Sequence, residues 1–314
     1  MAGRKPSEPP VLIISGPTGS GKSVLVHSLA AAHNVSVISA DSRQIIRGFD
    51  IGSSKPTGEE RRQYDYRMLD LIDPGQRYSA FAYARQAEGE IAEIVSSGRA
   101  PVVCGGSGLY LRALTRGFFE SPPADPEIRR ELENQAEELG PVRFHALLEK
   151  VDPISARAIH PQNVVRVVRA LEIFHSSGQT KSDLIDEQVQ SIPEYTYCEL
   201  ALAPPTEWLY ERINSRVEEM IQAGWESEVK DLVEEHGIDK IRAARAIGYG
   251  ELCDHLEGDI SLDESIELIK RNTRRFAKRQ MTWLRGTDSV KMYEKAETVY
   301  SDAVKLLNNK QIAD

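Results

Sequence analysis

Short apolar runs alternate with longer amphipathic stretches over the first third of the chain. The runs at residues 11–14, 35–39 and 101–104 have the length and the β-branched composition of buried strands. Residues 23–32 and 81–96, which lie between these runs, carry apolar side chains at helical spacing. This alternation of strand and helix predicts an α/β fold in which helices cover a parallel sheet.

The pattern becomes helical after about residue 122. Helices are predicted at 126–139, 141–151 and 164–176, then a return strand at 195–203, then helices at 206–223, 226–235, loosely 242–257, and 262–284, the last of which is expected to finish the chain. The expected organisation is a flexible tail at 1–10, a first part of the core at 11–121, a helical insertion at 122–194, and the rest of the core with C-terminal helices at 195–314.

Residues 16–23 read Gly-Pro-Thr-Gly-Ser-Gly-Lys-Ser and directly follow the first apolar run. This is the pattern of a phosphate-binding loop between a strand and a helix. Its glycines let backbone amides turn toward phosphate oxygens, while Lys22 reaches the outer phosphates and Ser23 offers a hydroxyl to Mg²⁺. The residues expected to bind a diphosphate or triphosphate are therefore Gly16, Pro17, Thr18, Gly19, Ser20, Gly21, Lys22 and Ser23.

Two further strand ends carry candidate chemistry. The second run leads into Asp41, and the third leads into the glycine-rich turn at 105–108. Because ligands of parallel sheets bind outside the carboxyl ends of the strands, both segments are expected near the phosphate loop. Asp41 could be a general base or a metal contact, or only a turn or helix-capping acid. The glycine-rich turn could approach a ligand, or only join a strand to a helix.

The formal net charge of −9 argues against sequence-blind binding of nucleic acid, but the charge is unevenly placed. Residues 270–285 contain seven basic residues and no acidic one. Phe276 and Trp283 could bury one helix face while the cations face phosphates, and amides and aromatic rings can read unpaired bases. The alternative is a solvated helix whose charges pair with acidic helices. A second basic patch follows His160, with Arg166 and Arg169.

Other features exclude several classes of protein. The three cysteines, Cys104, Cys198 and Cys253, are far apart and form no C-x-x-C pair, so neither a disulfide framework nor a zinc site is indicated. No apolar run reaches the length of a signal peptide or a membrane span. We therefore expect a cytoplasmic protein without a membrane partner, and a monomer by default.

The order of these segments resembles the bacterial-type tRNA dimethylallyltransferases, the isopentenyl (IPP) transferase family. The matching segments are 16–23, 38–44, 47–52 with Lys55 and Pro56, 105–111, 170–172, 246–249 and 274–285. They span nearly the whole chain in the family's order. The sequence departs from the family at Ile46, often Tyr, and at Gly250, often basic.

The resemblance implies a core like that of the P-loop nucleoside triphosphate hydrolases, with an all-helical insertion that binds tRNA. It implies transfer of a dimethylallyl group from dimethylallyl diphosphate to N6 of adenosine 37 in the anticodon stem-loop, with Mg²⁺, leaving N6-isopentenyladenosine and diphosphate. In this reading Asp41 is the base, Lys22 and Ser23 act on the diphosphate, and Arg216 neutralises further charge. The implied tRNA contacts are Asp41, Ser42, Arg43, Gln44, Ser107, Arg129, Arg166, Arg169, Arg245, Gly248, Tyr249, Lys278, Arg279, Gln280, Thr282, Trp283 and Arg285.

Three other functions are compatible with part of these features. An adenylate isopentenyltransferase would share the phosphate loop and the acid, but would not need the helical insertion or the basic helix. A small-molecule kinase would use the same loop to transfer phosphate from ATP. A nucleotide-dependent RNA-binding module would bind without turnover.

Overall fold

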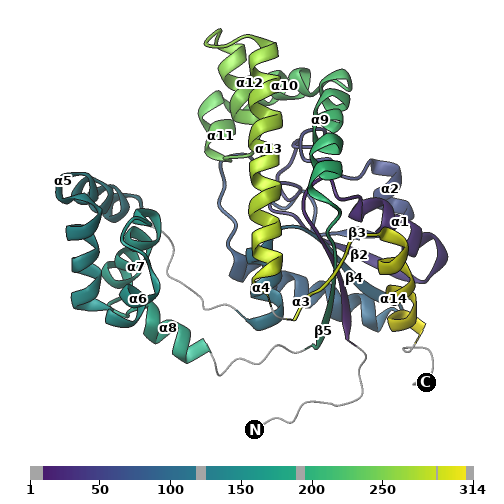
Figure 1. Ribbon diagram of the computed structural model, residues 1–314, viewed down its shortest axis with the longest axis horizontal. Helices are drawn as coiled ribbons and strands as arrows, with labels where there is room; N and C mark the ends of the chain where they lie inside the picture. Colours follow the sequence, from purple (N-terminus) through teal and green to yellow (C-terminus); the bar gives the residue numbers. More distant parts are fainter. Residues whose placement is uncertain (1–9, 118–124, 189–194, 288, 309–314) are drawn as a thin grey trace. The chain divides into compact units, whose positions relative to one another are not determined.

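The computed structural model describes residues 10–117, 125–188, 195–287 and 289–308. The chain forms two compact units, drawn in Figure 1. The first unit comprises Met1–Thr115 and Glu194–Asp314, and the second comprises Arg116–Pro193. The predicted insertion at 122–194 starts six residues later and ends one residue later than this second unit.

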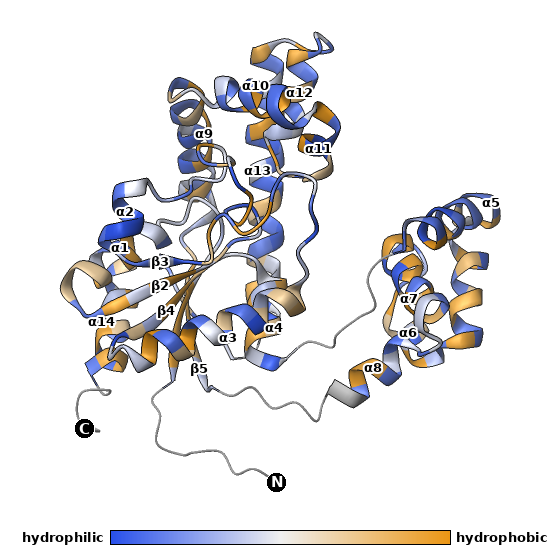
Figure 2. Ribbon diagram, turned by 180° about the vertical axis from the view of Figure 1, so that it is seen from behind, coloured by the Kyte–Doolittle hydropathy of each residue, from blue (hydrophilic) through white to orange (hydrophobic). Residues whose placement is uncertain are grey.

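The first unit is built on a six-stranded parallel sheet in the order β3-β2-β4-β1-β5-β6. The strands are β1 (Val11–Ser15), β2 (Val35–Ala40), β3 (Tyr66–Arg67), β4 (Ala100–Gly105), β5 (Tyr197–Leu202) and β6 (Lys291–Tyr293). Every residue of β1 and β2 is buried, as expected for parallel strands covered on both faces, and β2 and β4 are largely orange in Figure 2. Since β1 pairs with both β4 and β5, the chain after the second unit returns to complete the same sheet.

The helices of the first unit cover this sheet and extend beyond it. They are α1 (Lys22–Ala32), α2 (Gly58–Gln63), α3 (Ala80–Ser96), α4 (Gly108–Arg116), α9 (Thr206–Gln222), α10 (Trp225–His236), α11 (Ile238–Ala243), α12 (Tyr249–Leu256), α13 (Leu262–Arg285) and α14 (Ala296–Asn308). Leu12 and Ile14 of the central strand share a buried cluster with Leu29 of α1 and Val299 of α14. Figure 1 shows α13 running from α12 to α4. No helix among the described residues is long and apolar enough to cross a membrane.

The second unit is helical, as predicted. It contains α5 (Pro126–Val151), α6 (Pro153–Ala158), α7 (Val164–Ser177) and α8 (Lys181–Gln188). Helix α5 is broken at Gly140, where φ is 74°, and this matches the two helices expected from the Gly-Pro pair. Phe144 and Leu148 of α5 pack against Val167 and Leu171 of α7, so the unit has its own core.

Two expectations about the C-terminal region are wrong. The stretch 242–257 is not one helix, because α11 ends at Ala243 and α12 begins at Tyr249, with Arg245 in a left-handed conformation at φ 48° between them. The helix at 262–284 also does not finish the chain, because β6 and α14 follow it. Strand β6 has only three residues and pairs at the sheet edge, so its sequence carries too little apolar alternation to reveal it.

Trp225 joins helices α10–α12 to the loop that follows β2. The residue is 2% exposed, and its ring lies against two glycines. A Cβ atom at Gly52 would lie 2.1 Å from Trp225 Nε1, and one at Gly248 would lie 2.0 Å from Cη2. Beside it, the rings of Phe49 and Tyr249 stack with centroids 3.8 Å apart. Only glycine fits at both close approaches, so the two segments pack without a gap.

We expect Gly248→Ala to destabilise the protein strongly, whereas the neighbouring Gly250→Ala will not. At Gly248 φ is +92° and a methyl group meets the Trp225 ring, so the free energy of unfolding should fall by about 3 kcal/mol. At Gly250 nothing lies within 4 Å, so unfolding free energy should stay unchanged or rise by up to about 1 kcal/mol. Urea unfolding measures both, and equal effects would show that the Trp225 contact does not hold these segments.

Candidate active site

Three segments with candidate chemistry meet at the carboxyl edge of the sheet. Gly105 of β4 is in register with Ser15 of β1 on one side and with Ala40 of β2 on the other. The phosphate loop 16–23, the turn at 41–44 and the turn at 105–108 therefore leave three adjacent strands at one level. The sequence correctly predicted that each of these segments follows a strand. It could not predict the order of the strands in the sheet.

The phosphate loop has the backbone shape that its glycines permit. Gly19 and Gly21 have φ values of 79° and 91°, which a side chain would strain. Ser20 N donates to Pro17 O at 3.2 Å, and α1 begins directly at Lys22. The positive end of the α1 dipole and its free amides thus lie at the loop, which is the arrangement that binds phosphate groups.

Lys22 and Arg216 bring two cations into this region from α1 and α9. Burial lowers the pKa of Lys22, Cys104 and Asp41 oppose this, and Arg216 lowers it further. Burial also lowers the pKa of Arg216. The charge of Arg212 lowers this pKa further, and the charge of Asp41 raises it. Two cations whose charged forms are disfavoured by burial, with one carboxylate nearby, form a site that favours a multiply charged anion. Arg216, which the sequence reached only through the family resemblance, therefore lies within electrostatic range of Lys22 and Asp41.

Asp41 is oriented by the turn that it starts. Its Oδ1 atom accepts a hydrogen bond from Arg43 N at 2.8 Å. Ser42 N donates to Ser107 Oγ at 2.9 Å, and Ser107 N donates to Ala40 O at 3.1 Å, so the turns after β2 and β4 are tied together. Asp41 is thus a turn acid, which was one of the alternatives left open by the sequence. The turn also fixes the direction of its carboxylate, and a general base requires such a fixed direction.

Arg43 and Gln44 use their side chains within the protein. Arg43 Nη1 donates to Ala244 O at 2.7 Å, which ties the Asp41 turn to the segment between α11 and α12. Gln44 Nε2 donates to Ser54 O at 3.1 Å, and Gln44 Oε1 accepts from Ser39 Oγ at 2.8 Å. Their contacts with tRNA stay a prediction. The structure gives them a role in shaping the loop after β2.

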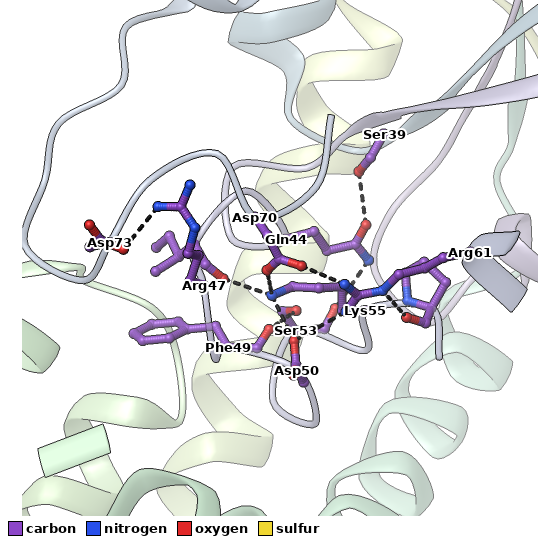
Figure 3. A network of polar contacts seen from close by, with 12 residues as sticks. Ser39, Gln44, Arg47, Phe49, Asp50, Ser53, Lys55, Arg61, Asp70 and Asp73 are labelled. Carbon is purple, nitrogen blue, oxygen red and sulfur yellow. Dashed lines mark hydrogen bonds and ion pairs between the residues drawn. The ribbon is translucent and has the colours of Figure 1, made fainter. Parts of the chain in front are cut away.

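Lys55 lies at the centre of a polar network inside this loop (Figure 3). Its side chain is completely buried, and Nζ contacts Ile46 O at 2.7 Å, Asp70 Oδ1 at 2.6 Å and Asp50 Oδ1 at 2.7 Å. Arg61 bonds to the same two carboxylates. Ser54 and Asp70 have positive φ values of 49° and 54°, so the network holds a strained backbone in place. The sequence contained Lys55 as part of the family resemblance but gave no sign of its burial.

Glu228 holds the same loop from the outside. Its carboxylate accepts from Ile51 N at 2.6 Å, from Asp50 N at 3.2 Å, and from the Tyr249 hydroxyl at 2.6 Å. Burial raises the pKa of Glu228, and the hydrogen bonds from Ile51 N and the Tyr249 hydroxyl oppose the change. Gly248 and Tyr249, predicted to contact tRNA, are buried in this packing, whereas Arg245 is exposed. Their contacts with tRNA remain predictions.

Helix α13 presents cations along one side. Lys278, Arg279, Thr282 and Arg285 are exposed, and so are Arg271 and Arg275 nearer its start. Lys270 pairs with Glu218 and Glu267, as the solvated-helix alternative expects. Over the described part of the chain, none of the five exposed cations has a carboxylate partner within ion-pair distance. From Arg271 to Arg285 the helix rises about 21 Å. This surface suits a row of phosphates.

Gln280 and Trp283, from the same helix, face the core. Gln280 Oε1 accepts from Thr18 N at 2.9 Å and Gln280 Nε2 donates to Gly106 O at 2.9 Å. Trp283 covers Gly108, where a Cβ atom would lie 2.5 Å from its Cε2 atom. Both residues were predicted to contact tRNA, which stays untested, and both connect α13 to the edge of the sheet.

The remaining predicted contacts lie in the second unit. Arg129 belongs to α5, and Arg166 and Arg169 belong to α7. Arg169 Nη1 lies 2.9 Å and Arg129 Nη1 3.9 Å from the same oxygen of Glu172, whose side chain is completely buried. A buried carboxylate thus brings two cations together on the second unit.

The chain matches known proteins over most of its length. A family model described as IPP transferase matches residues 44–287. A tRNA dimethylallyltransferase of Geobacter metallireducens is 42% identical over 280 residues, covering 89% of this chain and 91% of the relative. One from Geobacter sulfurreducens is 41% identical over 294 residues, covering 94% of each chain.

Solved structures give the same result. The full-length tRNA isopentenylpyrophosphate transferase from Bacillus halodurans matches with a TM-score of 0.68 and 35% identity, over 97% of this chain and 98% of that one. A eukaryotic dimethylallyltransferase acting on tRNA matches with a TM-score of 0.74 and 28% identity, over 88% of this chain and 70% of that one. The predicted P-loop α/β fold is confirmed by these neighbours.

We expect Lys55→Met to destabilise the protein because it leaves Asp50 and Asp70 without their buried partner. The loss in unfolding free energy should be about 3 kcal/mol. Lys305→Met is the matched control, since Lys305 forms an exposed pair with Asp302, and its effect should stay within about 0.5 kcal/mol. Thermal and urea unfolding of both variants check this. Equal stabilities would contradict a holding role for Lys55.

Proposed function

The chain belongs to the IPP transferase family, and we propose that it transfers a dimethylallyl group from dimethylallyl diphosphate to N6 of adenosine 37 in tRNA. The family relatives support an enzyme that modifies tRNA by prenyl transfer. The observation that carries the proposal is the meeting of Lys22, Arg216 and Asp41 at one sheet edge, with the cationic helix α13 anchored there. The anticodon stem-loop is the proposed part of the tRNA.

The donor site would hold the diphosphate as the leaving group. Lys22 and Arg216 supply two positive charges, and the first turn of α1 supplies amides and the positive end of its dipole. As the bond from the allylic carbon to oxygen breaks, negative charge grows on the departing diphosphate. Donors already aimed at that position stabilise the transition state more than the substrate.

Mg²⁺ fits this donor set. Among the described residues no group of three His, Cys, Asp or Glu side chains could hold a metal. Mg²⁺ does not need one, because it commonly keeps several waters and binds through substrate phosphates with one or two protein ligands. Ser23, exposed in the first turn of α1, would be such a ligand. When bound, the ion would offset the charge of the leaving diphosphate.

Asp41 would take the proton from the adenine amine. The lone pair of this amine is delocalised into the ring, so it is a weak nucleophile until a base removes its proton. The N–C bond forms, the C–O bond to diphosphate breaks, and the proton passes to the Asp41 carboxylate. A positioned base contributes on the order of 10²–10⁴ in rate. The hydrogen bond from Arg43 N keeps this carboxylate pointed in one direction.

The RNA would bind through local cations in spite of the acidic average. The exposed cations of α13 would contact phosphates, and Arg271 and Arg275 extend this surface beyond the tRNA contacts that the resemblance implied. A stacked adenosine cannot present its amine to Asp41, so it would have to be flipped out. Arg129, Arg166 and Arg169 are proposed as further contacts from the second unit. We further propose a cytoplasmic monomer.

We expect radiolabelled dimethylallyl diphosphate to label tRNA, and neither AMP nor ATP, in the presence of Mg²⁺. Asp41→Asn should lower kcat by about 10²-fold or more while tRNA affinity changes little, because the amide cannot accept the proton. The readouts are transfer of label and tRNA binding by filter retention. Label on AMP alone would establish the adenylate isopentenyltransferase alternative, and phosphate transfer from ATP would establish a kinase. Weak binding with normal turnover would make Asp41 a recognition residue.

We expect the double variant Lys278→Gln and Arg279→Gln to weaken tRNA binding and to reduce its salt dependence. Each lost contact with a single-stranded phosphate should lower the magnitude of the slope of log K against log salt by about 0.7. Lys305→Gln removes an exposed cation from α14 and is the control. Binding titrations over a range of salt concentrations measure the slopes. Unchanged slopes would identify this face of α13 as solvated surface only.

A further inference from the structure

Gln280 connects the RNA-facing helix to the phosphate loop through both ends of its amide. Its oxygen accepts from Thr18 N and its nitrogen donates to Gly106 O, each at 2.9 Å. These partners are 262 and 174 residues away in the chain. The side chain is partly buried, while its neighbours Lys278, Arg279 and Thr282 are exposed. Gln280 is thus turned away from the cationic face and toward the donor site.

The space around this amide is tightly filled. A Cβ atom at Gly106 would lie 2.5 Å from Gln280 Nε2 and 2.8 Å from Gly16 O, so the glycine lets the amide enter between the two turns. At another position of the loop, a Cβ atom at Gly19 would lie 3.0 Å from Ile213 of α9. Ile213 in turn packs against Ala277, one turn before Gln280. Helices α9 and α13 therefore both contact the loop.

The geometry points to Gln280 as a positioning residue that fixes the phosphate loop for the diphosphate, rather than as a contact to tRNA. This inference rests on the proposed function, because it concerns the same donor site. The loop contains glycines at 16, 19 and 21, which permit many backbone conformations. A loop that binds an anion through its amides has a lower affinity if the loop becomes ordered only on binding, because the ordering costs free energy. The bond to Thr18 N removes part of that ordering cost before the donor arrives.

Only an amide of this length makes both contacts. Thr18 N needs an acceptor and Gly106 O needs a donor, and the glutamine side chain offers one of each on a single planar group. Glutamate would lack the donor, and asparagine is one methylene shorter. Because both polar ends are engaged, reading an RNA base with this amide would require breaking these bonds.

The test uses inorganic diphosphate with Mg²⁺ as the probe, measured by titration calorimetry on the full chain. For Gln280→Leu we expect diphosphate to bind roughly tenfold more weakly, which is the size of one lost hydrogen bond. The KM for dimethylallyl diphosphate should rise in step, while tRNA affinity stays within about twofold. The matched control on the same helix is Lys278→Gln, for which tRNA binding should weaken and diphosphate binding should not.

Gln280→Asn keeps the amide, but its shorter side chain cannot reach both partners, so diphosphate binding should weaken in this variant too. If the leucine variant does not fold, the asparagine variant provides the test. Unchanged diphosphate affinity in either folded variant would overturn the inference, as would a loss confined to tRNA. The proposed function fails separately, if the wild-type chain neither binds diphosphate nor labels tRNA.

Discussion

The site depends on two neighbouring cations, Lys22 and Arg216, whose hydration is weakened by burial. Burial lowers the pKa of both Lys22 and Arg216, Arg216 lowers that of Lys22 further, and Asp41 compensates only part of their charge. Such a pair is stable as a charged site when an anion with several negative oxygens sits against it. A diphosphate has that character, and the α1 N-terminus beside it adds to the same field. Donor binding and leaving-group stabilisation therefore come from one arrangement.

The acid opposite these cations is useful only if its loop keeps one shape. The loop after β2 is held from within by buried Lys55 and from outside by Glu228, and Trp225 packs against it through Gly52. This fixation commits side chains that could otherwise face RNA. For example, the hydroxyl of Tyr249 donates its hydrogen bond to Glu228. The structure thus separates residues that shape the site from the exposed cations of α13 that remain for the RNA.

The sequence predicted local structure correctly where residues close together in the chain determine the conformation. The phosphate loop follows from its glycines, and the position of Asp41 after a strand follows from the apolar run before it. The break of α5 at Gly140 follows from the Gly-Pro pair. The predictions for the interval between α11 and α12 and for the short strand β6 were wrong, because both segments are bound by residues far away in the chain. Arg43 donates a hydrogen bond to Ala244 O beside Arg245, and β6 pairs with β5.

By itself the sequence determined the α/β core, the phosphate loop, the helical second unit and the family, because each is written in residues adjacent in the chain. The tertiary structure alone decided what each side chain of a motif does. It turned Gln280 toward Thr18 and Gly106 and left Lys278 in solvent, although both lie in one helical segment. A helix carries both faces in one stretch of sequence, and only the packing of α13 against the sheet edge determines which face meets the loop and which meets water.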